Sequence, residues 1–560
     1  MKNKSTRFIP LLMAVCVVVG IAIGRFYTNQ FAVSRMNSMI HNSSNKVNAL
    51  MRIIDEKYVD TVKVGDLVES TMPFILSELD PHSSYIPAKD LEAVTADLKG
   101  HFSGIGIQFM IQDDTIHINS VIEGGPSEKV GLMAGDRIIE IDDSAFVGKI
   151  VTNQSAMSHL KGEKGSTVKL GIFRPGETET LYFTIIRGDI PVKSIDAAYM
   201  INDKFGYVNI NKFGETTYAE LLFALAKLGQ ENMEGLIIDL RGNTGGYMSA
   251  AIQMVNEFLP NNQLIVYTEG RKSPRENYMS NGTGSNQTLP IVVLTDEGSA
   301  SASEIFAGAI QDNDRGIIIG RRSFGKGLVQ QPIEFNDGSA IRLTIARYYT
   351  PSGRCIQKPY EKGKGTEYEL DLLTRYEHGE FFSADSIKQN VKETYQTLKG
   401  RTVYGGGGIM PDIFVPRDTT GYTSYFRMAA SRGLIARFTF EYSDKNRKKL
   451  QEFTTNEELV SYLKKQNLVI NFANWAEKKG LKRRNKMMLT SRKLFEFSLY
   501  SGIVYDMMNK EALIKYENET DPTVLKALEV LEKGETFPQG PADNVVDAKD
   551  DIEIETTNNK

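Results

Sequence analysis

The sequence predicts a multidomain protein in which an α/β part and a mainly β part are flanked by helical segments. With 560 residues, the chain exceeds the usual size of a single domain. Residues 102–187 show short apolar runs separated by glycine-rich turns, which predicts a β domain. Residues 194–415 alternate strand-like with helix-like segments, and this alternation is typical of a mainly parallel sheet with crossover helices.

A basic segment, MKNKSTR, opens the chain and precedes a run of 17 uncharged residues, FIPLLMAVCVVVGIAIG. A membrane-spanning helix takes roughly 17–25 residues, so this run is just long enough. Positive residues on its amino side predict a cytoplasmic N-terminus and export of everything behind it. We therefore interpret residues 1–30 as a signal anchor. The small residues Ala22 and Gly24 leave cleavage of the segment open as the alternative.

Residues 31–98 are predicted to form a helical region. The segment VNALMRIIDEKYV (47–59) places its apolar residues at helical spacing. The segment LSELDPHSSYIP (76–87) interrupts this pattern with residues that favour turns. A helical cap or arm is the simplest interpretation of the region.

The β part, residues 99–190, shows an order of elements that indicates a known type of domain. Five strand-like runs (GIGIQFMI, TIHINSVI, DRIIEID, TVKLGIFR and ETLYFTIIRG) accompany two helix-like segments, GGPSEKVGLMAGD and NQSAMSHLKGEKG. This order resembles a PDZ domain. The resemblance places the carboxylate-binding loop at Gly104, Ile105, Gly106 and Ile107, where backbone N–H groups would hold the C-terminus of a peptide that adds as a strand. A PDZ domain that only packs against its neighbour is the alternative.

The segments after the α/β part show no residues arranged for chemistry. Residues 416–535 are predicted to form a helical extension, and residues 536–560 a disordered tail that ends in the acidic segment DAKDDIEIETTNNK. The formal net charge of −4 gives no indication of a nucleic-acid partner. No recognisable spacing of metal ligands or phosphate-binding glycines occurs, so we expect no metal and no other cofactor.

Three serines at alternate positions, Ser299, Ser301 and Ser303, lie between a strand-like run and a helix-like segment in DEGSASASEIF. A serine hydroxyl needs a base to attack a carbonyl at neutral pH. Histidine is the usual base, but His378 is the only histidine after the serines, and its charged segment, RYEHGEFF, has no catalytic pattern. A Ser-His-Asp triad would therefore depend on long-range packing.

Lysine is the other known base for a serine. In RRSFGKGLVQQP, Lys326 lies between two glycines and directly before a strand-like run. Burial among the apolar neighbours Phe324, Leu328 and Val329 would lower its pKa, because the charged form loses solvation. A solvated lysine in a surface turn is the alternative.

Several segments together resemble the C-terminal processing peptidases, also called tail-specific proteases, of serine peptidase family S41. They are the serine segment, SFGKGLVQ, LIIDLRGNTGG (236–246), LDPHSSY (79–85), the PDZ-like segment and GGGGIMPDIFV (405–415), and the resemblance covers about residues 47–415. It implies a ClpP/crotonase-like α/β protease core over residues 191–415, with an inserted PDZ domain, a helical N-terminal region and a helical C-terminal extension.

The resemblance also implies the site residues. It puts the nucleophile at Ser301, the general base at Lys326 and the residue that orients the lysine at Gln330. Side chains of like parity project to one face of a strand, so Gln330 can reach the neighbourhood of Lys326. The oxyanion hole falls on the backbone N–H groups of Ala302, where a helix N-terminus favours negative charge, and of Gly242.

The function implied by the resemblance is a serine endopeptidase of the bacterial cell envelope, anchored in the inner membrane with its catalytic part in the periplasm, or exported after signal cleavage. It would act on protein substrates with free, apolar C-termini. The role of the PDZ domain as activator or inhibitor stays open, as do a homo-oligomer and an adaptor protein. Two other functions are alternatives: a non-catalytic PDZ adaptor that binds protein C-termini, and an acyl-transfer or hydratase enzyme that acts on small thioesters.

Overall fold

The computed structural model describes residues 19–20, 46–388 and 393–538. The chain divides into two compact units, residues 1–79 and 80–560, and each is described by itself. Within the described residues, no helix combines the length and the apolar character that a bilayer crossing requires. The predicted anchor, apart from Val19 and Gly20, and the tail from residue 539 onward lie outside the described residues, so both stay predictions.

The first unit contains the helices α2 (Lys46–Lys57) and α3 (Val64–Ser77). Residues 80–98, predicted to continue this helical region, belong to the second unit instead. There β1 (Ser84–Ile86) pairs antiparallel with β18 (Ala340–Tyr349), and α4 (Ala88–Lys99) follows. Such long-range strand pairing leaves no local signal in the sequence, which is why the turn residues of LDPHSSY suggested only an interruption.

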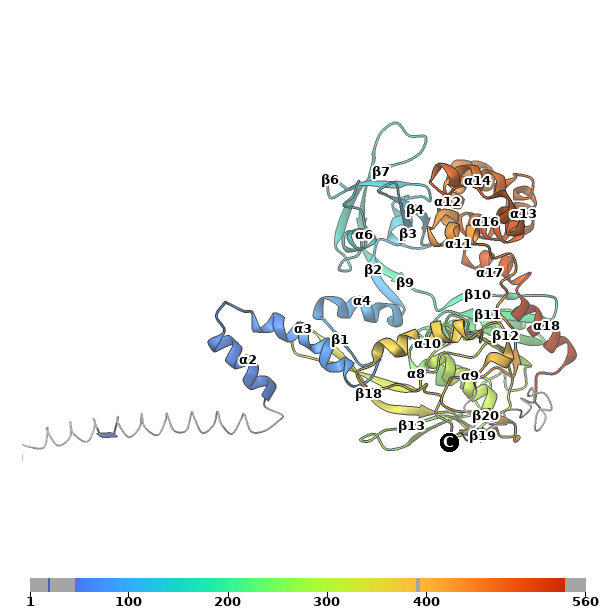
Figure 1. Cartoon of the computed structure of the whole chain (residues 1–560). Helices are drawn as coiled ribbons and strands as arrows, with labels where there is room; N and C mark the ends of the chain where they lie inside the picture. The colour runs from blue at the N-terminus through green and yellow to red at the C-terminus, as the bar shows by residue number, and fades with distance from the viewer. Residues whose placement is uncertain (1–18, 21–45, 389–392, 539–560) are drawn as a thin grey trace, which may run out of the picture. The chain divides into compact units, whose positions relative to one another are not determined.

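A β domain is inserted between α4 and the rest of the second unit (Figure 1). Its entrance, β2 (His101–Gly104), and its exit, β9 (Gly188–Pro191), pair antiparallel. Its sheet has the order β3 (Ile107–Gln112), β4 (Thr115–Val121), β5 (Arg137–Ile141), β7 (Thr167–Phe173) and β8 (Leu181–Ile186), with β6 (Ser144–Ala145) beside β5 and the helices α5 (Pro126–Lys129) and α6 (Asn153–Leu160). Because β3 is the terminal strand of this sheet, no other strand of the described residues pairs with its outer edge.

The core of the second unit is a six-stranded sheet of order β10 (Ile195–Met200), β11 (Phe205–Ile210), β12 (Gly235–Asp239), β15 (Ile291–Thr295), β16 (Ile317–Gly320) and β21 (Ile413–Phe414). Its pairs are parallel except for β10 with β11. Successive side chains of a strand point to opposite faces. Accordingly, Ile238 and Val293 enter one apolar cluster, whereas Ile237 and Val292 enter another, so both faces of the sheet are buried.

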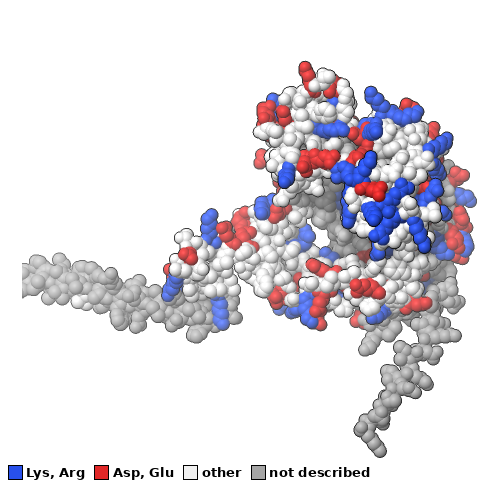
Figure 2. All heavy atoms as spheres, turned by 45° about the horizontal axis from the view of Figure 1, so that its top comes forward, with Lys and Arg blue, Asp and Glu red and all other residues white. Residues whose placement is uncertain are grey.

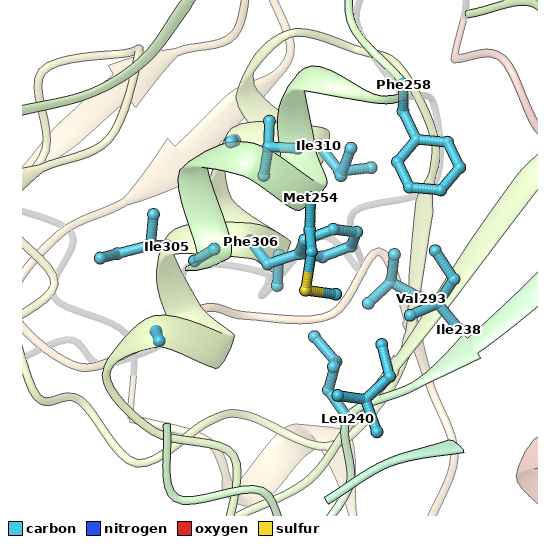
Figure 3. Close-up of a cluster of buried hydrophobic side chains, with 14 of the residues drawn as sticks. Ile238, Leu240, Met254, Phe258, Val293, Ile305, Phe306 and Ile310 are labelled. Carbon is cyan, nitrogen blue, oxygen red and sulfur yellow. The ribbon is translucent and has the colours of Figure 1, made fainter. Parts of the chain in front are cut away.

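Three helices cover the first face: α7 (Thr217–Gln230), α8 (Met248–Asn256) and α9 (Ala302–Asp312). Figure 3 shows Met254 of α8 and Phe306 of α9 beside Ile238 and Val293 of the sheet. All 11 residues of α9 are buried. This burial holds in place the helix whose N-terminus follows the predicted nucleophile.

Two C-terminal helices cover the second face. Residues of α17 (Lys510–Asn518) and α18 (Pro522–Lys533) join the same apolar cluster as Ile237. The predicted helical extension therefore has two parts with different roles. The last two helices complete the α/β core, and the preceding helices form a bundle with an apolar core of its own: α11 (Ser424–Ser431), α12 (Leu434–Leu450), α13 (Asn456–Leu463), α14 (Leu468–Lys478), α15 (Asn485–Thr490) and α16 (Arg492–Met507).

The surface of this bundle is rich in positive charge. Figure 2 shows Lys and Arg side chains gathered over it. The exposed cations of residues 478–493 are Lys478, Lys479, Lys482, Arg484, Lys486, Arg492 and Lys493. We interpret this surface as a solvated face, since none of the predicted site residues lies in the bundle.

A second sheet has the order β1, β18, β13 (Leu264–Glu269) and β14 (Glu276–Met279), and β17 (Leu328–Glu334) pairs with β18 as well. In the register of β17 and β18, Gln330 is the partner of Thr344. Helix α10 (Gly365–Glu377), a 3-10 turn (Ala384–Ser386) and the hairpin of β19 (Thr394–Gln396) and β20 (Thr402–Tyr404) follow in the chain. This sheet carries the predicted lysine-orienting residue.

Candidate active site

The three alternate serines have different surroundings. The hydroxyl of Ser299 donates to the carbonyl of Leu240 at 2.8 Å, and the hydroxyl of Ser303 donates to the carbonyl of Asn243 at 2.8 Å. Both outer serines are fully buried, whereas Ser301 is partly exposed. The outer serines thus fasten the turn before α9 to the loop after β12, and Ser301 is the serine that a substrate can reach.

Ser301 has a backbone conformation that residues other than glycine rarely adopt, with φ 56° and ψ −113°. It directly precedes α9, where the first backbone N–H groups lack intrahelical acceptors and the helix dipole favours negative charge. Strained backbone of this kind persists only where the surrounding structure enforces it. Here the hydrogen bonds of the Glu304 side chain enforce the conformation.

A single buried carboxylate, that of Glu304, holds the backbones of Ser301 and Lys326. Its Oε2 accepts from the N–H of Ser301 at 2.8 Å and from the N–H of Lys326 at 2.9 Å. Its Oε1 accepts from the N–H of Gly325 at 2.7 Å and from the hydroxyl of Ser323 at 2.5 Å. Burial raises the pKa of Glu304 to about 7, and the four hydrogen bonds oppose this rise.

An acidic residue in the first turn of a helix is common, so the sequence around Glu304 indicates nothing beyond the start of α9. Its bond to residue 326 depends on the tertiary fold, so no local pattern could have revealed it. The same holds for Tyr348, whose hydroxyl donates to the carbonyl of Lys326 and lies 3.1 Å from the carbonyl of Ser301. Both side chains tie the segment of the predicted nucleophile to the segment of the predicted base.

Lys326 lies in surroundings that favour its neutral form. Burial and then the positive charge of Arg342 lower its pKa, against the opposite influence of Glu304 and Asp80. Its Nζ donates to Oε1 of Gln330 at 3.2 Å. The structure thus brings the lysine and the glutamine together, as the strand parity suggested. Lys326 lies just before β17, and Gln330 lies within it.

The two residues predicted for the oxyanion hole differ. Ala302 is the first residue of α9, so its N–H belongs to the unsatisfied first turn of the helix beside Ser301. The N–H of Gly242 donates to Oδ1 of Asp296 at 2.8 Å in this structure, so its part in an oxyanion hole stays a prediction. Among the glycines of that loop, Gly245 is the one that lies beside the serine, since a Cβ built on it would be 2.7 Å from Cβ of Ser301.

The residues predicted to bind a peptide carboxylate form one short loop. Gly104 ends β2 and Ile107 begins β3, so Ile105 and Gly106 connect the two strands. Gly106 has a φ of 79°, a left-handed conformation that favours glycine. The carbonyl of Ile105 accepts from the N–H of Ser127 at 2.9 Å, which fixes the loop to α5.

Comparison with known proteins identifies the family. Residues 204–367 match peptidase family S41, residues 103–185 match the PDZ domain, and residues 425–509 match a family of unknown function (DUF8443). The carboxy-terminal processing protease CtpB of Bacillus subtilis (strain 168) is 33% identical over 383 residues, which cover 66% of this chain and 77% of that protein. This chain belongs to peptidase family S41. It is a serine protease of the carboxy-terminal processing type, with a PDZ domain.

Other S41 relatives cover similar parts of the chain. The carboxy-terminal-processing protease of Bartonella bacilliformis (strain ATCC 35685 / KC583 / Herrer 020/F12,63) is 33% identical over 412 residues, which cover 72% of this chain and 92% of that protein. Among solved structures, the photosystem II D1 C-terminal processing protease shares 27% sequence identity, with a TM-score of 0.32, and the match covers 55% of this chain and 88% of that chain. The two family matches, together with the observed order of strands and helices, give this S41 protease a mixed α/β protease core with a PDZ domain, as the sequence predicted.

Proposed function

We propose that this S41 protease is an endopeptidase that uses a dyad of Ser301 and Lys326 and selects protein substrates by their free C-termini. The observation that supports the dyad most directly is the anchoring of both residues' backbones to the one carboxylate of Glu304. The lowered pKa of Lys326 increases the fraction of neutral amine available as a base at a given pH.

In the proposed reaction, Oγ of Ser301 forms a bond with the carbonyl carbon of the substrate, and its proton goes to Nζ of neutral Lys326. The oxyanion lies near the N-terminus of α9, where the N–H of Ala302 can donate to it. The C–N bond then breaks, and Lys326 returns the proton to the leaving amine. Water next attacks the resulting ester while Lys326 takes its proton, and transfer of that proton to Oγ of Ser301 completes the hydrolysis.

In this proposal the PDZ domain selects the substrate. Backbone N–H groups of residues 104–107 hold the terminal carboxylate, and the peptide pairs with the outer edge of β3 as an added strand. The side chain of Ile105 is buried, and that of Ile107 is partly buried against the same apolar cluster. An apolar loop of this kind favours substrates whose last residues are apolar.

Replacing Gly106 with valine tests the recognition step. A side chain at this left-handed position is strained, and its Cβ would lie 3.0 Å from Cδ1 of Ile190 and 3.3 Å from Cδ of Pro126. Relieving this strain of roughly 1–2 kcal/mol moves the loop out of its binding conformation, and peptide binding must restore that conformation at the same cost. We expect affinity for a labelled peptide with an apolar C-terminus, measured by fluorescence anisotropy, to fall about tenfold or more, because 1.4 kcal/mol corresponds to a factor of ten.

The matched control is Gly176→Val, since Gly176 also has a positive φ of 100° but has open space around it. The Gly176→Val variant has the same kind of backbone strain but does not change the carboxylate-binding loop of residues 104–107. It should therefore bind the peptide like the wild type. If Gly106→Val bound the peptide with wild-type affinity, or if the wild type bound apolar and acidic C-termini equally well, the loop of residues 104–107 would not be the site that selects substrates.

The pH dependence of cleavage follows from the surroundings of Lys326. Only the neutral amine acts as a base, so kcat/KM should rise with pH and level off below the ordinary lysine pKa of 10.5. Arg342 lowers the pKa of Lys326, so its loss in Arg342→Met stabilises the ammonium form and should move the rising limb to higher pH. The control Arg347→Met, at an exposed position on the same strand, should leave the limb unmoved. A limb that stays in place in Arg342→Met would mean that Lys326 is not the titrating base.

We also propose that residues 8–24 anchor the protease in the inner membrane of a bacterial cell envelope, with the catalytic part on the periplasmic side. The uncharged run behind a basic segment supports this placement. Substrates for such an enzyme would be exported or membrane-attached proteins with accessible C-termini.

A further inference from the structure

Residues 80–83 of the segment LDPHSSY have no role in the mechanism above, yet they form a turn in the second unit that side-chain hydrogen bonds hold closed. Oδ1 of Asp80 accepts from the N–H of His82 at 2.9 Å and from the N–H of Ser83 at 2.9 Å. Its Oδ2 accepts from the hydroxyl of Ser83 at 2.6 Å. Asp80 and Ser83 are both buried. A turn closed on one buried carboxylate has little freedom, so the carbonyl of His82 has a fixed direction.

Strand β18 ties this turn to Gln330. The N–H of Thr344 donates to Oγ of Ser83 at 3.1 Å, and the hydroxyl of Thr344 donates to Oδ1 of Asp80 at 3.1 Å. Thr344 is also the register partner of Gln330. The carbonyl of His82 accepts a hydrogen bond from Nε2 of Gln330 at 2.5 Å. The turn and the glutamine side chain are thus connected through one strand and one direct bond.

The bond from Gln330 to His82 decides which way the glutamine amide faces. A side-chain amide has one accepting oxygen and one donating NH2 group, whereas a backbone carbonyl can only accept. The NH2 group must therefore face His82, and Oε1 faces Lys326, whose Nζ is 3.2 Å away. When neutral Nζ of Lys326 donates one N–H to Oε1 of Gln330, its lone pair cannot point at that oxygen and is held pointing away from it. The aspartate of a Ser-His-Asp triad orients its imidazole in a comparable way.

We propose that the Asp80–Ser83 turn is a positioning element of the protease: through the carbonyl of His82 it fixes the amide of Gln330, and so directs the lone pair of neutral Lys326 toward Ser301. The inference rests on the proposed dyad. The residues of the turn act through Gln330 and do not touch the substrate in this account.

The test uses the full-length protein with the variants Asp80→Ala and Asp80→Asn and the control Asp90→Asn. Asp90 is an exposed residue of α4, so its replacement removes the same charge without touching the turn. Alanine cannot close the turn, whereas the oxygen of asparagine can still accept both backbone N–H groups. We expect Asp80→Ala to lower kcat on the order of 10²-fold, because misplaced catalytic groups cost rates of this size. KM should stay unchanged, and Asp80→Asn should recover part of the rate.

A pH profile separates positioning from a general loss of folding. The charged groups that face Lys326 are Glu304, Arg342 and Asp80, and the imidazole of His82 is neutral because burial and then Lys326 lower its pKa to about 4. Asp80 raises the pKa of Lys326, so its loss in Asp80→Asn should move the rising limb of kcat/KM to lower pH while the plateau falls. Both Asp80 variants lose this charge, so the limb should move alike in the two, and the larger fall of the plateau per folded molecule in Asp80→Ala than in Asp80→Asn reports the positioning.

The outcomes distinguish the turn from the dyad. Wild-type kcat and an unmoved limb in both Asp80 variants, together with an inactive Lys326→Ala protein, would overturn the positioning role and leave the dyad standing. An active Lys326→Ala protein would overturn both. If Asp80→Ala does not fold, Asp80→Asn alone is used for the test, with its kcat and the rising limb of its kcat/KM profile against pH as the two measurements.

Discussion

Replacing Lys326 with alanine is expected to lower cleavage of an unfolded reporter on the order of 10⁶-fold, as is replacing Ser301 with alanine, because serine and base act as one unit. For the same reason the double variant should be no less active than either single variant. The measurement is turnover per folded molecule, with cleavage followed by mass spectrometry of the products. Any residual activity of the variants comes from binding and from the oxyanion donors.

The neighbouring serine provides the control for this prediction. Ser299→Ala loses a buried hydrogen bond to the carbonyl of Leu240, so its melting temperature should fall while its turnover per folded molecule stays close to wild type. If Ser299→Ala were inactive and Ser301→Ala active, the nucleophile would be the wrong serine. If Lys326→Ala cleaved like the wild type, another base would have to be sought.

Glu304→Gln is expected to produce the second largest effect, on stability and activity together. The carboxylate accepts four hydrogen bonds, two on each oxygen, three of them from backbone N–H groups and one from the hydroxyl of Ser323. A hydroxyl can also accept, so the glutamine NH2 group turns one or two of these bonds into contacts between donors, depending on the side that it faces. An unsatisfied buried donor costs about 1–3 kcal/mol, so the free energy of unfolding should fall by roughly 1–6 kcal/mol. The turnover of the folded fraction should fall as well, because Ser301 and Lys326 lose their common anchor.

Glu257→Gln is the matched control for that experiment. Glu257 is also a buried carboxylate that accepts a backbone N–H, that of Ser285 at 2.8 Å, and it lies outside the candidate site. Thermal melts should show a loss of stability in both variants, and only Glu304→Gln should lose turnover per folded molecule. Equal turnover losses in the two variants would reduce the role of Glu304 to general stability.

Local patterns predicted much of the architecture. The alternation of strands and helices over residues 191–415 gave the α/β core, and the glycine-rich strand runs gave the PDZ domain. These predictions succeed because periodicity and turn chemistry are local properties of the chain. The serine, lysine and glutamine assignments came from the family resemblance, and the structure places Lys326 and Gln330 in contact.

The features that the sequence could not predict all depend on contacts between distant segments. Strand β1 becomes a strand only because β18 pairs with it. The helices α17 and α18 have the same amphipathic pattern as the bundle before them, and only the fold assigns them to the core sheet. The N–H of Gly242 is taken by Asp296, a residue more than fifty positions later. Glu304 and Tyr348 join Ser301 to Lys326 by the same kind of long-range contact.

The proposed mechanism requires that Ser301 is the nucleophile and that Lys326 activates it. We would incubate the full-length protein with a fluorophosphonate over a series of pH values, digest it and locate the adduct by mass spectrometry. We expect a single adduct on Ser301 that forms faster as pH rises and that does not form in Lys326→Ala over the same time. An adduct on Ser299 or Ser303, or equal labelling of the wild type and Lys326→Ala, would contradict it.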